Sequence, residues 1–217
     1  MKRVTLLLVL TLLAVLSFTA SNKLYAQSPS PSTYLSQWSK AQDDDKTNPA
    51  TIRLTLNRLL MEHAILTSLH LRALYDGRNT DPTRMLLADN AAKIQDVFVS
   101  NSNISSEQFY SIWDEHMRQY ERYTVALKNN DANGMTDARN RLNDLANQFG
   151  SLLDRNNRAI TGEMLATHMR NHTNGTLAIM DAYAPQDHDQ IIYRTKTALD
   201  QAKEFADMLA AAFTNNR

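Results

Sequence analysis

The stretch that decides the fold, "LLMEHAILTSLHLRAL", spans residues 59–74 and combines an apolar helical pattern with two histidines. Its leucines recur at spacings of three and four residues, so they share one face of an α-helix. His63 lies on that face, and His70 follows two helical turns later. A buried imidazole needs partners for its nitrogens, because an unmade buried hydrogen bond costs about 1–3 kcal/mol. We therefore expect a buried helix over residues 51–75 whose histidines have partners inside the protein.

Helical periodicity continues from this stretch to the end of the chain. The chain contains only five glycines, and no run alternates in the way that strands do. Gly77 and Pro82 are expected to end the first helix, and Ser105 suits the N-cap of the third. Short connections make neighbouring helices antiparallel, which predicts an all-α, up-and-down bundle of six helices in a domain over residues 50–217. The expected helices are 51–75, 83–99, 106–129, 135–154, 161–182 and 187–213.

The first 49 residues differ in composition from the rest. Residues 1–26 begin "MKR", continue "VTLLLVLTLLAVLSFTA" and become polar, which is typical of a signal peptide. An uncleaved N-terminal anchor is the alternative, because an apolar run of about 17 residues is at the lower limit for crossing a bilayer. Residues 27–49 carry Ser-Pro repeats and an Asp run, which predict a flexible tether. We expect an exported protein (secreted, periplasmic or associated with the cell envelope) with no membrane span in its mature chain.

Charge and residue usage exclude several function classes. The chain has 23 basic and 23 acidic residues, and without residues 1–26 the balance is 20 to 23. The sequence contains no cluster of basic residues of the kind that binds nucleic acid. Cysteine is absent, so disulfides and thiol nucleophiles are excluded. G-x-S-x-G, H-E-x-x-H and phosphate-loop motifs are also missing, and no catalytic residue can be assigned.

Three histidine segments align without gaps. His63, His116 and His168 stand 53 and 52 residues apart, each with apolar residues three and four positions before it. The helix that follows each segment supplies an aromatic residue 33–37 positions after the histidine. This pattern predicts three helical hairpins with a pseudo-repeat of about 52 residues. The aromatic residues are Phe98, Phe149 and Phe205.

The inward-facing histidines allow two interpretations. In the first, each histidine forms hydrogen bonds across the bundle and fixes its register. In the second, His63, His116 and His168 bind a transition metal or a planar cofactor, since metal sites in bundles use side chains from facing helices. Three histidines with an open fourth position suit zinc or copper. His70 and His172 are secondary candidates, and His168 and His172 form the only local pair with a spacing that can chelate from one helix.

Methionines and acids stand close to the histidines in sequence. Methionine thioethers are copper ligands, but methionine also fills gaps in helical cores. Glu62 and Glu115 each precede a histidine by one residue, about 100° around the helix, which places them at the flank or in solvent. There they could orient an imidazole from outside the site. The methionines are Met61, Met117, Met164 and Met169.

The three segments resemble an uncharacterised family of exported bacterial all-helical proteins. The family pattern is Leu-Leu-x-Glu-His early, Trp-x-x-His in the middle and a late histidine followed by a run like "DAYA". Here these motifs are residues 59–63, Trp113 with His116, and His168 with residues 180–184. Family members often carry a further histidine that aligns near Gln201, and its absence here weakens a site of four histidines. The resemblance implies the helical fold and export, and it implies no activity.

Three hypotheses follow for function. The leading one is an exported bundle that handles a transition metal or a small ligand through His63, His116 and His168. The second is a structural or interaction protein of the cell envelope, whose histidines are hydrogen-bonded in the core. The third is an enzyme of unknown reaction. The first requires imidazole nitrogens within about 5 Å of one another, since each Zn–N bond is about 2.0–2.1 Å long.

Overall fold

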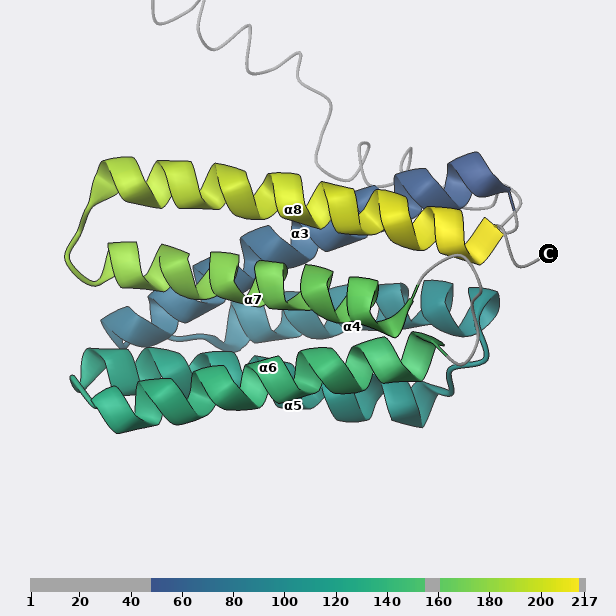
Figure 1. Cartoon of the computed structure of the whole chain (residues 1–217). Helices are drawn as coiled ribbons and strands as arrows, with labels where there is room; N and C mark the ends of the chain where they lie inside the picture. Colours follow the sequence, from purple (N-terminus) through teal and green to yellow (C-terminus); the bar gives the residue numbers. More distant parts are fainter. Residues whose placement is uncertain (1–47, 155–160, 215–217) are drawn as a thin grey trace, which may run out of the picture. The chain divides into compact units, whose positions relative to one another are not determined.

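The computed structural model describes residues 48–154 and 161–214, and all regular secondary structure in these ranges is α-helical (Figure 1). The prediction of an all-α bundle is confirmed, with the same order of helices and bounds close to those expected. The predicted signal peptide and nearly all of the predicted tether lie outside the described residues. The helices are α3 (Pro49–Asp76), α4 (Asp81–Asn101), α5 (Ser106–Lys128), α6 (Ala132–Asp154), α7 (Gly162–Tyr183) and α8 (His188–Thr214).

Local capping chemistry explains where several helices begin and end. Asn48 caps α3, because its Oδ1 accepts from the backbone N–H of Ala50 at 2.9 Å. Gly77 ends α3 with a left-handed φ of 71°, a conformation that residues with a Cβ rarely adopt. Ser105 and Gln108 form a reciprocal capping box at the start of α5. Caps of this kind depend on a few neighbouring residues, which is why sequence alone placed these bounds well.

Helix α3 contacts four other helices. It packs against α4 and α8 along much of its length and also contacts α5 and α7. Further extensive contacts link α5 to α6, α6 to α7 and α7 to α8, with fewer between α4 and α5 and between α5 and α7. Figure 1 shows α5 beside α6 and α7 beside α8. A side chain on the inner face of α3 can therefore meet side chains from α5, α7 and α8 at one level.

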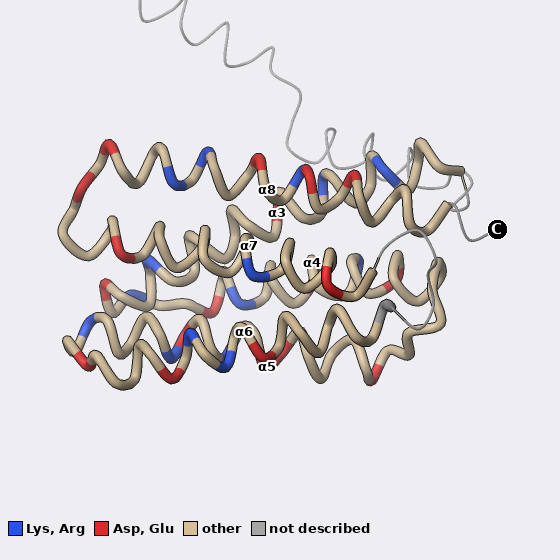
Figure 2. The backbone as a smooth tube through the Cα atoms, in the orientation of Figure 1, with Lys and Arg blue, Asp and Glu red and all other residues tan. Residues whose placement is uncertain are grey.

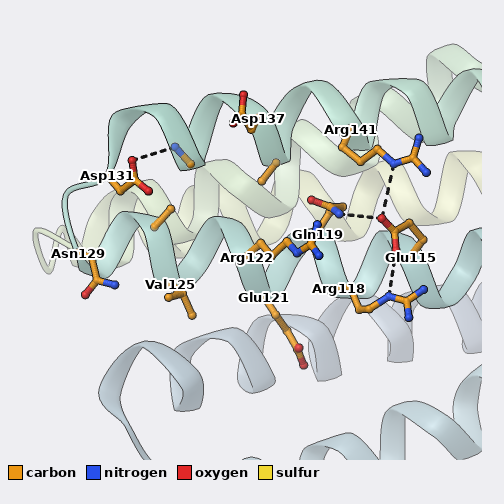
Figure 3. Close-up of a pocket in the computed structure, with 13 residues that line it drawn as sticks. Glu115, Arg118, Gln119, Glu121, Arg122, Val125, Asn129, Asp131, Asp137 and Arg141 are labelled. Atoms are coloured by element: carbon orange, nitrogen blue, oxygen red, sulfur yellow. Dashed lines mark hydrogen bonds and ion pairs between the residues drawn. The ribbon is translucent and has the colours of Figure 1, made fainter.

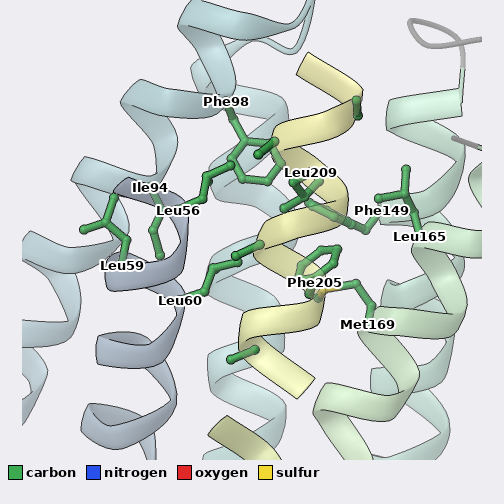
Figure 4. Close-up of a cluster of buried hydrophobic side chains, with 14 of the residues drawn as sticks. Leu56, Leu59, Leu60, Ile94, Phe98, Phe149, Leu165, Met169, Phe205 and Leu209 are labelled. Atoms are coloured by element: carbon green, nitrogen blue, oxygen red, sulfur yellow. The ribbon is translucent and has the colours of Figure 1, made fainter. Parts of the chain in front are cut away.

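The larger hydrophobic cluster fills the end of the bundle that contains the first half of α3 (Figure 4). Phe98, Phe149 and Phe205, the aromatic residues of the three predicted hairpins, meet there. Their ring centroids are 5.7 Å apart for Phe98 and Phe149 and 6.2 Å apart for Phe149 and Phe205. Contacts between hairpins, α6 with α7 and α3 with α8, are as extensive as contacts within them. The pseudo-repeat therefore stays a prediction, since close packing does not distinguish repeated units from one continuous bundle.

A second, smaller cluster surrounds Tyr120, Leu71 and Met180. The larger cluster contains residues of all six described helices, whereas the smaller one contains residues of α3, α5, α6 and α7 at another level. On α5 and α7, His116 and His172 lie between the residues of the two clusters. Acidic and basic residues are interspersed along the described helices (Figure 2). None of the described helices is long and apolar enough to cross a membrane.

Candidate metal centre

Three buried histidines from three helices converge inside the bundle. His63 comes from α3, His116 from α5 and His172 from α7. Each offers one ring nitrogen, and these three atoms all lie within 4.8 Å of one another. The side chains are almost fully enclosed, with exposed fractions of 2%, 2% and 7%. A group of nitrogen ligands from separate elements is the arrangement that bundle proteins use to hold metals.

His116 is fixed in one tautomer by its own helix. Its Nδ1 lies 2.6 Å from the backbone carbonyl of Trp113, and a carbonyl oxygen only accepts, so Nδ1 carries the hydrogen and donates it. Nε2 then holds a free lone pair, and it is buried with no hydrogen-bond partner among the described residues. Burial lowers the pKa of His116 to about 3, and the nearby His172 acts in the same direction. The ring is therefore neutral at physiological pH, as a metal ligand must be.

His63 also has an unsatisfied nitrogen. Its Nε2 lies 3.4 Å from the Thr67 hydroxyl, while Nδ1 is buried with no partner in hydrogen-bonding geometry. Burial, followed by the proximity of His116 and His172, holds its pKa well below the usual value. The Asn90 amide opposes this shift, but Asn90 Oδ1 is itself buried without a bonded partner, so the contact falls short of a hydrogen bond. Asn90 is held by its Nδ2, which donates to the Leu59 carbonyl at 3.0 Å.

His172 completes the group from α7. Its ring centroid lies 5.9 Å from that of His63, and the His63 ring lies 5.6 Å from His116. Burial alone lowers the pKa of His172 to about 4. Since all three rings are neutral, none repels a cation, and the three face one another without a counter-charge.

A small cavity of about 20 Å³ lies between the rings. A cavity needs about 10–15 Å³ to hold one water molecule, so this one has room for a single water or a single ion. Four helices contribute to its wall, because α8 adds Ala202 and Phe205 to the residues from α3, α5 and α7. The lining residues are Leu60, His63, Trp113, His116, Met169, His172, Ala202 and Phe205.

The structure changes one member of the predicted histidine set. His63 and His116 meet as expected, but the third member is His172, and His168 lies outside the group. The inward stripe of α7 runs through Leu165, Met169 and His172, which are all buried. His168 is half-buried at the edge of this stripe, where its ring stacks on Phe205 with centroids 6.1 Å apart and planes 14° apart. His168 and His172, four residues apart, differ by only about 40° around the axis of α7. A small rotation of the helix therefore decides which of them faces the cavity.

His70, the other secondary candidate, is buried but stands apart from the three rings. Its Nδ1 lies 3.0 Å from the Thr83 hydroxyl, and its Nε2 donates to Glu121 Oε1 at 2.8 Å. Both nitrogens are therefore satisfied by the protein. This pairing lowers the pKa of Glu121. His70 therefore has a structural role, as a hydrogen-bonded histidine of the core.

Of the methionines and acids near the histidines in sequence, one methionine lines the cavity. Met169 lines the cavity, whereas Met164 is exposed. Met61 and Met117 pack against the hydrophobic clusters, as gap-filling methionines do. Glu62 and Glu115 pair with other groups and do not line the cavity. Gln201, near which the family pattern has a histidine, is also absent from the lining.

A much larger groove, of about 850 Å³, lies between α5 and α6 (Figure 3). Its prominent charges neutralise one another, since Glu115 pairs with both Arg118 and Arg141. Gln119 donates a further hydrogen bond to Glu115 at 2.8 Å. Size alone therefore does not mark a binding site here, whereas the convergence of three buried imidazoles at the small cavity does.

Comparison of the chain with models of protein families, with curated proteins and with solved structures found no match. The family resemblance suggested by the three histidine motifs therefore stays a prediction. The function has to be argued from the geometry of the site itself.

Proposed function

We propose that this protein binds a single transition-metal ion through His63, His116 and His172, in an extracytoplasmic role such as metal handling. The observation that carries the proposal is the convergence of three ligand nitrogens within 4.8 Å from three helices. Two nitrogens bound to one metal at about 2.0–2.1 Å stand roughly 3.3–3.6 Å apart. Nitrogens at the 4.8 Å limit have to approach by roughly 1.2–1.5 Å, which rotations of the imidazoles about their broad χ2 torsions can supply.

The unsatisfied nitrogens support a bound ion. Buried polar atoms in folded proteins almost always have a partner, and a buried exception calls for an explanation. His116 Nε2 and His63 Nδ1 are such exceptions, and His116 is already oriented by the Trp113 carbonyl. A hydrogen bond from the far nitrogen of a ligating histidine is the usual way in which proteins orient metal ligands. A single water in the 20 Å³ cavity is the competing occupant, and it would leave the histidines with a structural role.

Export is part of the same proposal. Residues 1–26 have the composition of a signal peptide, and no cysteine is available anywhere in the chain to compete for a soft metal. A metal-binding bundle outside the cytoplasm would meet metal ions directly from the surroundings.

The test is the metal content of the protein. The full chain is expressed with its own N-terminal segment, purified without an affinity tag, dialysed against zinc or copper and analysed by elemental mass spectrometry. We expect about one metal per chain, and none in His116→Ala or His172→Ala. The matched control is His168→Ala, on the same helix one turn away, which should keep the metal.

Circular dichroism of each variant establishes that its helices are intact, so that loss of metal is not loss of fold. A folded wild-type protein that takes up neither metal would overturn the proposal in favour of the water-filled, structural site. Retention of a stoichiometric metal by both His116→Ala and His172→Ala would also overturn it, because the ion would then be bound elsewhere.

A further inference from the structure

Among the described residues that line the small cavity, one further side chain besides the three histidines offers a metal-ligand atom, the sulfur of Met169. Besides the three imidazoles, the lining consists of aliphatic or aromatic side chains and this methionine. Met169 stands one turn before His172 on the inward stripe of α7 and is buried. Figure 4 shows its side chain extending from α7 toward Phe205 on α8, and both residues line the cavity. The structure thus adds one soft thioether to three borderline nitrogens.

The acids nearest in sequence do not supply charge to the cavity. Glu62, next to His63, accepts from Asn90 Nδ2 at 3.2 Å and pairs with Arg58. Glu115, next to His116, pairs with Arg118 and Arg141 on the α5–α6 surface (Figure 3). No carboxylate lines the cavity in the described part of the chain.

We infer that the ion this site selects is monovalent and soft, namely Cu(I), with the Met169 thioether as its fourth ligand. The inference rests on the proposed metal function and specifies its cargo. It involves no redox step, since copper is taken up already reduced and stays so.

Charge is the first reason for a monovalent ion. The cost of moving an ion from water into a medium of low dielectric grows with the square of its charge, so a divalent ion pays about four times the cost of a monovalent one. Three neutral rings provide no negative charge that would offset this desolvation cost. Zn(II) sites without carboxylate or thiolate typically keep a water or hydroxide on the metal, and this cavity offers little room for one beside the ion.

Ligand type is the second reason. Thioether sulfur is a soft ligand that selects Cu(I), whereas imidazole suits zinc, copper, iron and nickel alike and does not by itself select the monovalent ion. The thioether is therefore the group that gives the site its preference. Met180 supplies a matched comparison on the same helix, because it is also buried but packs in the second hydrophobic cluster and does not line the cavity.

The experiment compares Met169→Leu with Met180→Leu in the full chain. Leucine nearly conserves the volume of methionine, so both variants should fold. Cu(I) affinity is measured under anaerobic conditions by competition with the chromogenic chelator bicinchoninate, and Zn(II) affinity by a fluorescent chelator. We expect Met169→Leu to weaken Cu(I) binding by about tenfold or more and to leave Zn(II) binding unchanged. Met180→Leu should change neither affinity.

A second readout detects the sulfur directly. With ¹³C-methyl methionine, addition of Ag(I), a monovalent ion with the same filled d shell and no redox activity, should shift one methyl resonance strongly. That resonance should be missing in Met169→Leu and present in Met180→Leu. Zn(II) should not shift it in the same way.

The outcomes separate this inference from the proposed function. If the protein binds Zn(II) as tightly as Cu(I), or Met169→Leu binds Cu(I) like the wild type, the Cu(I) inference fails and the metal site stands. If Cu(I), Ag(I) and Zn(II) all fail to bind the folded protein, the proposed function itself is overturned.

Discussion

The buried His70 and the three converging histidines differ in whether their ring nitrogens have partners in the protein. His70 is enclosed as fully as His63 or His116, yet both of its nitrogens have protein partners in Thr83 and Glu121. In the group formed by His63, His116 and His172, two buried nitrogens have none. Burial of a histidine is therefore not the feature that points to a ligand, because a satisfied imidazole is a stable part of a core. The feature is the convergence of ring nitrogens from three helices, in a group where two buried nitrogens are left unsatisfied.

The largest expected difference between the two regions is in their response to acid. The folded-state pKa values of His116 and His172 are lowered to about 3 and about 4, below the 6.5 of an exposed histidine. The unfolded chain therefore binds protons between pH 6.5 and about 4 that the folded chain does not, and stability falls as pH falls. In the metal-free protein we expect a loss approaching 1.4 kcal/mol per pH unit for each of these histidines.

Urea unfolding between pH 6.5 and 4.5 measures this slope. Carboxylates such as Glu121 have their pKa held below 4.5, so they contribute mainly below this window. His172→Leu should reduce the slope by the share of one histidine. An equal slope in the wild type and His172→Leu would mean that the group is not buried in neutral form.

The second effect is stabilisation by the metal. A ligand at 1,000 times its dissociation constant stabilises the folded state by about 4 kcal/mol, which for a domain of this size corresponds to roughly 10 °C in Tm. We expect this rise in thermal melts with saturating Cu(I). It should vanish in His172→Ala and persist in His70→Ala, and a rise of the same size in both variants would contradict the assigned ligands.

The third effect is the cost of removing the satisfied histidine. His70→Ala leaves a space in the core and removes both hydrogen bonds, which we expect to cost about 2–3 kcal/mol of unfolding free energy. Glu121 is partly exposed and regains water, so the loss is smaller than for a fully buried pair. Chemical denaturation measures the loss, and the metal content should stay at the wild-type value. Loss of the metal together with stability would remove the distinction between the two regions.

Sequence predicted the fold more completely than the site, for physical reasons. Helix ends depend on local groups such as Gly77 and the capping box of Ser105, and inward faces follow from apolar spacing. The choice between His168 and His172 depends on the rotation of α7 against α3 and α8, which no local pattern encodes. The alignment of the histidine segments favoured His168. The burial of Met169 one turn before His172 is visible only once the helices are packed.

The smallest expected effect tests this choice directly. His168 is half-buried and stacked on Phe205, so His168→Ala should cost only about 1 kcal/mol, the usual scale for one aromatic contact. Phe205 also borders the cavity, but none of the three assigned ligands is changed, so the metal stoichiometry should hold. Denaturation and metal analysis of the same sample provide both numbers. If His168→Ala loses its metal and His172→Ala keeps it, α7 in solution is turned by about 40° from the arrangement described, and the sequence alignment had the ligand right.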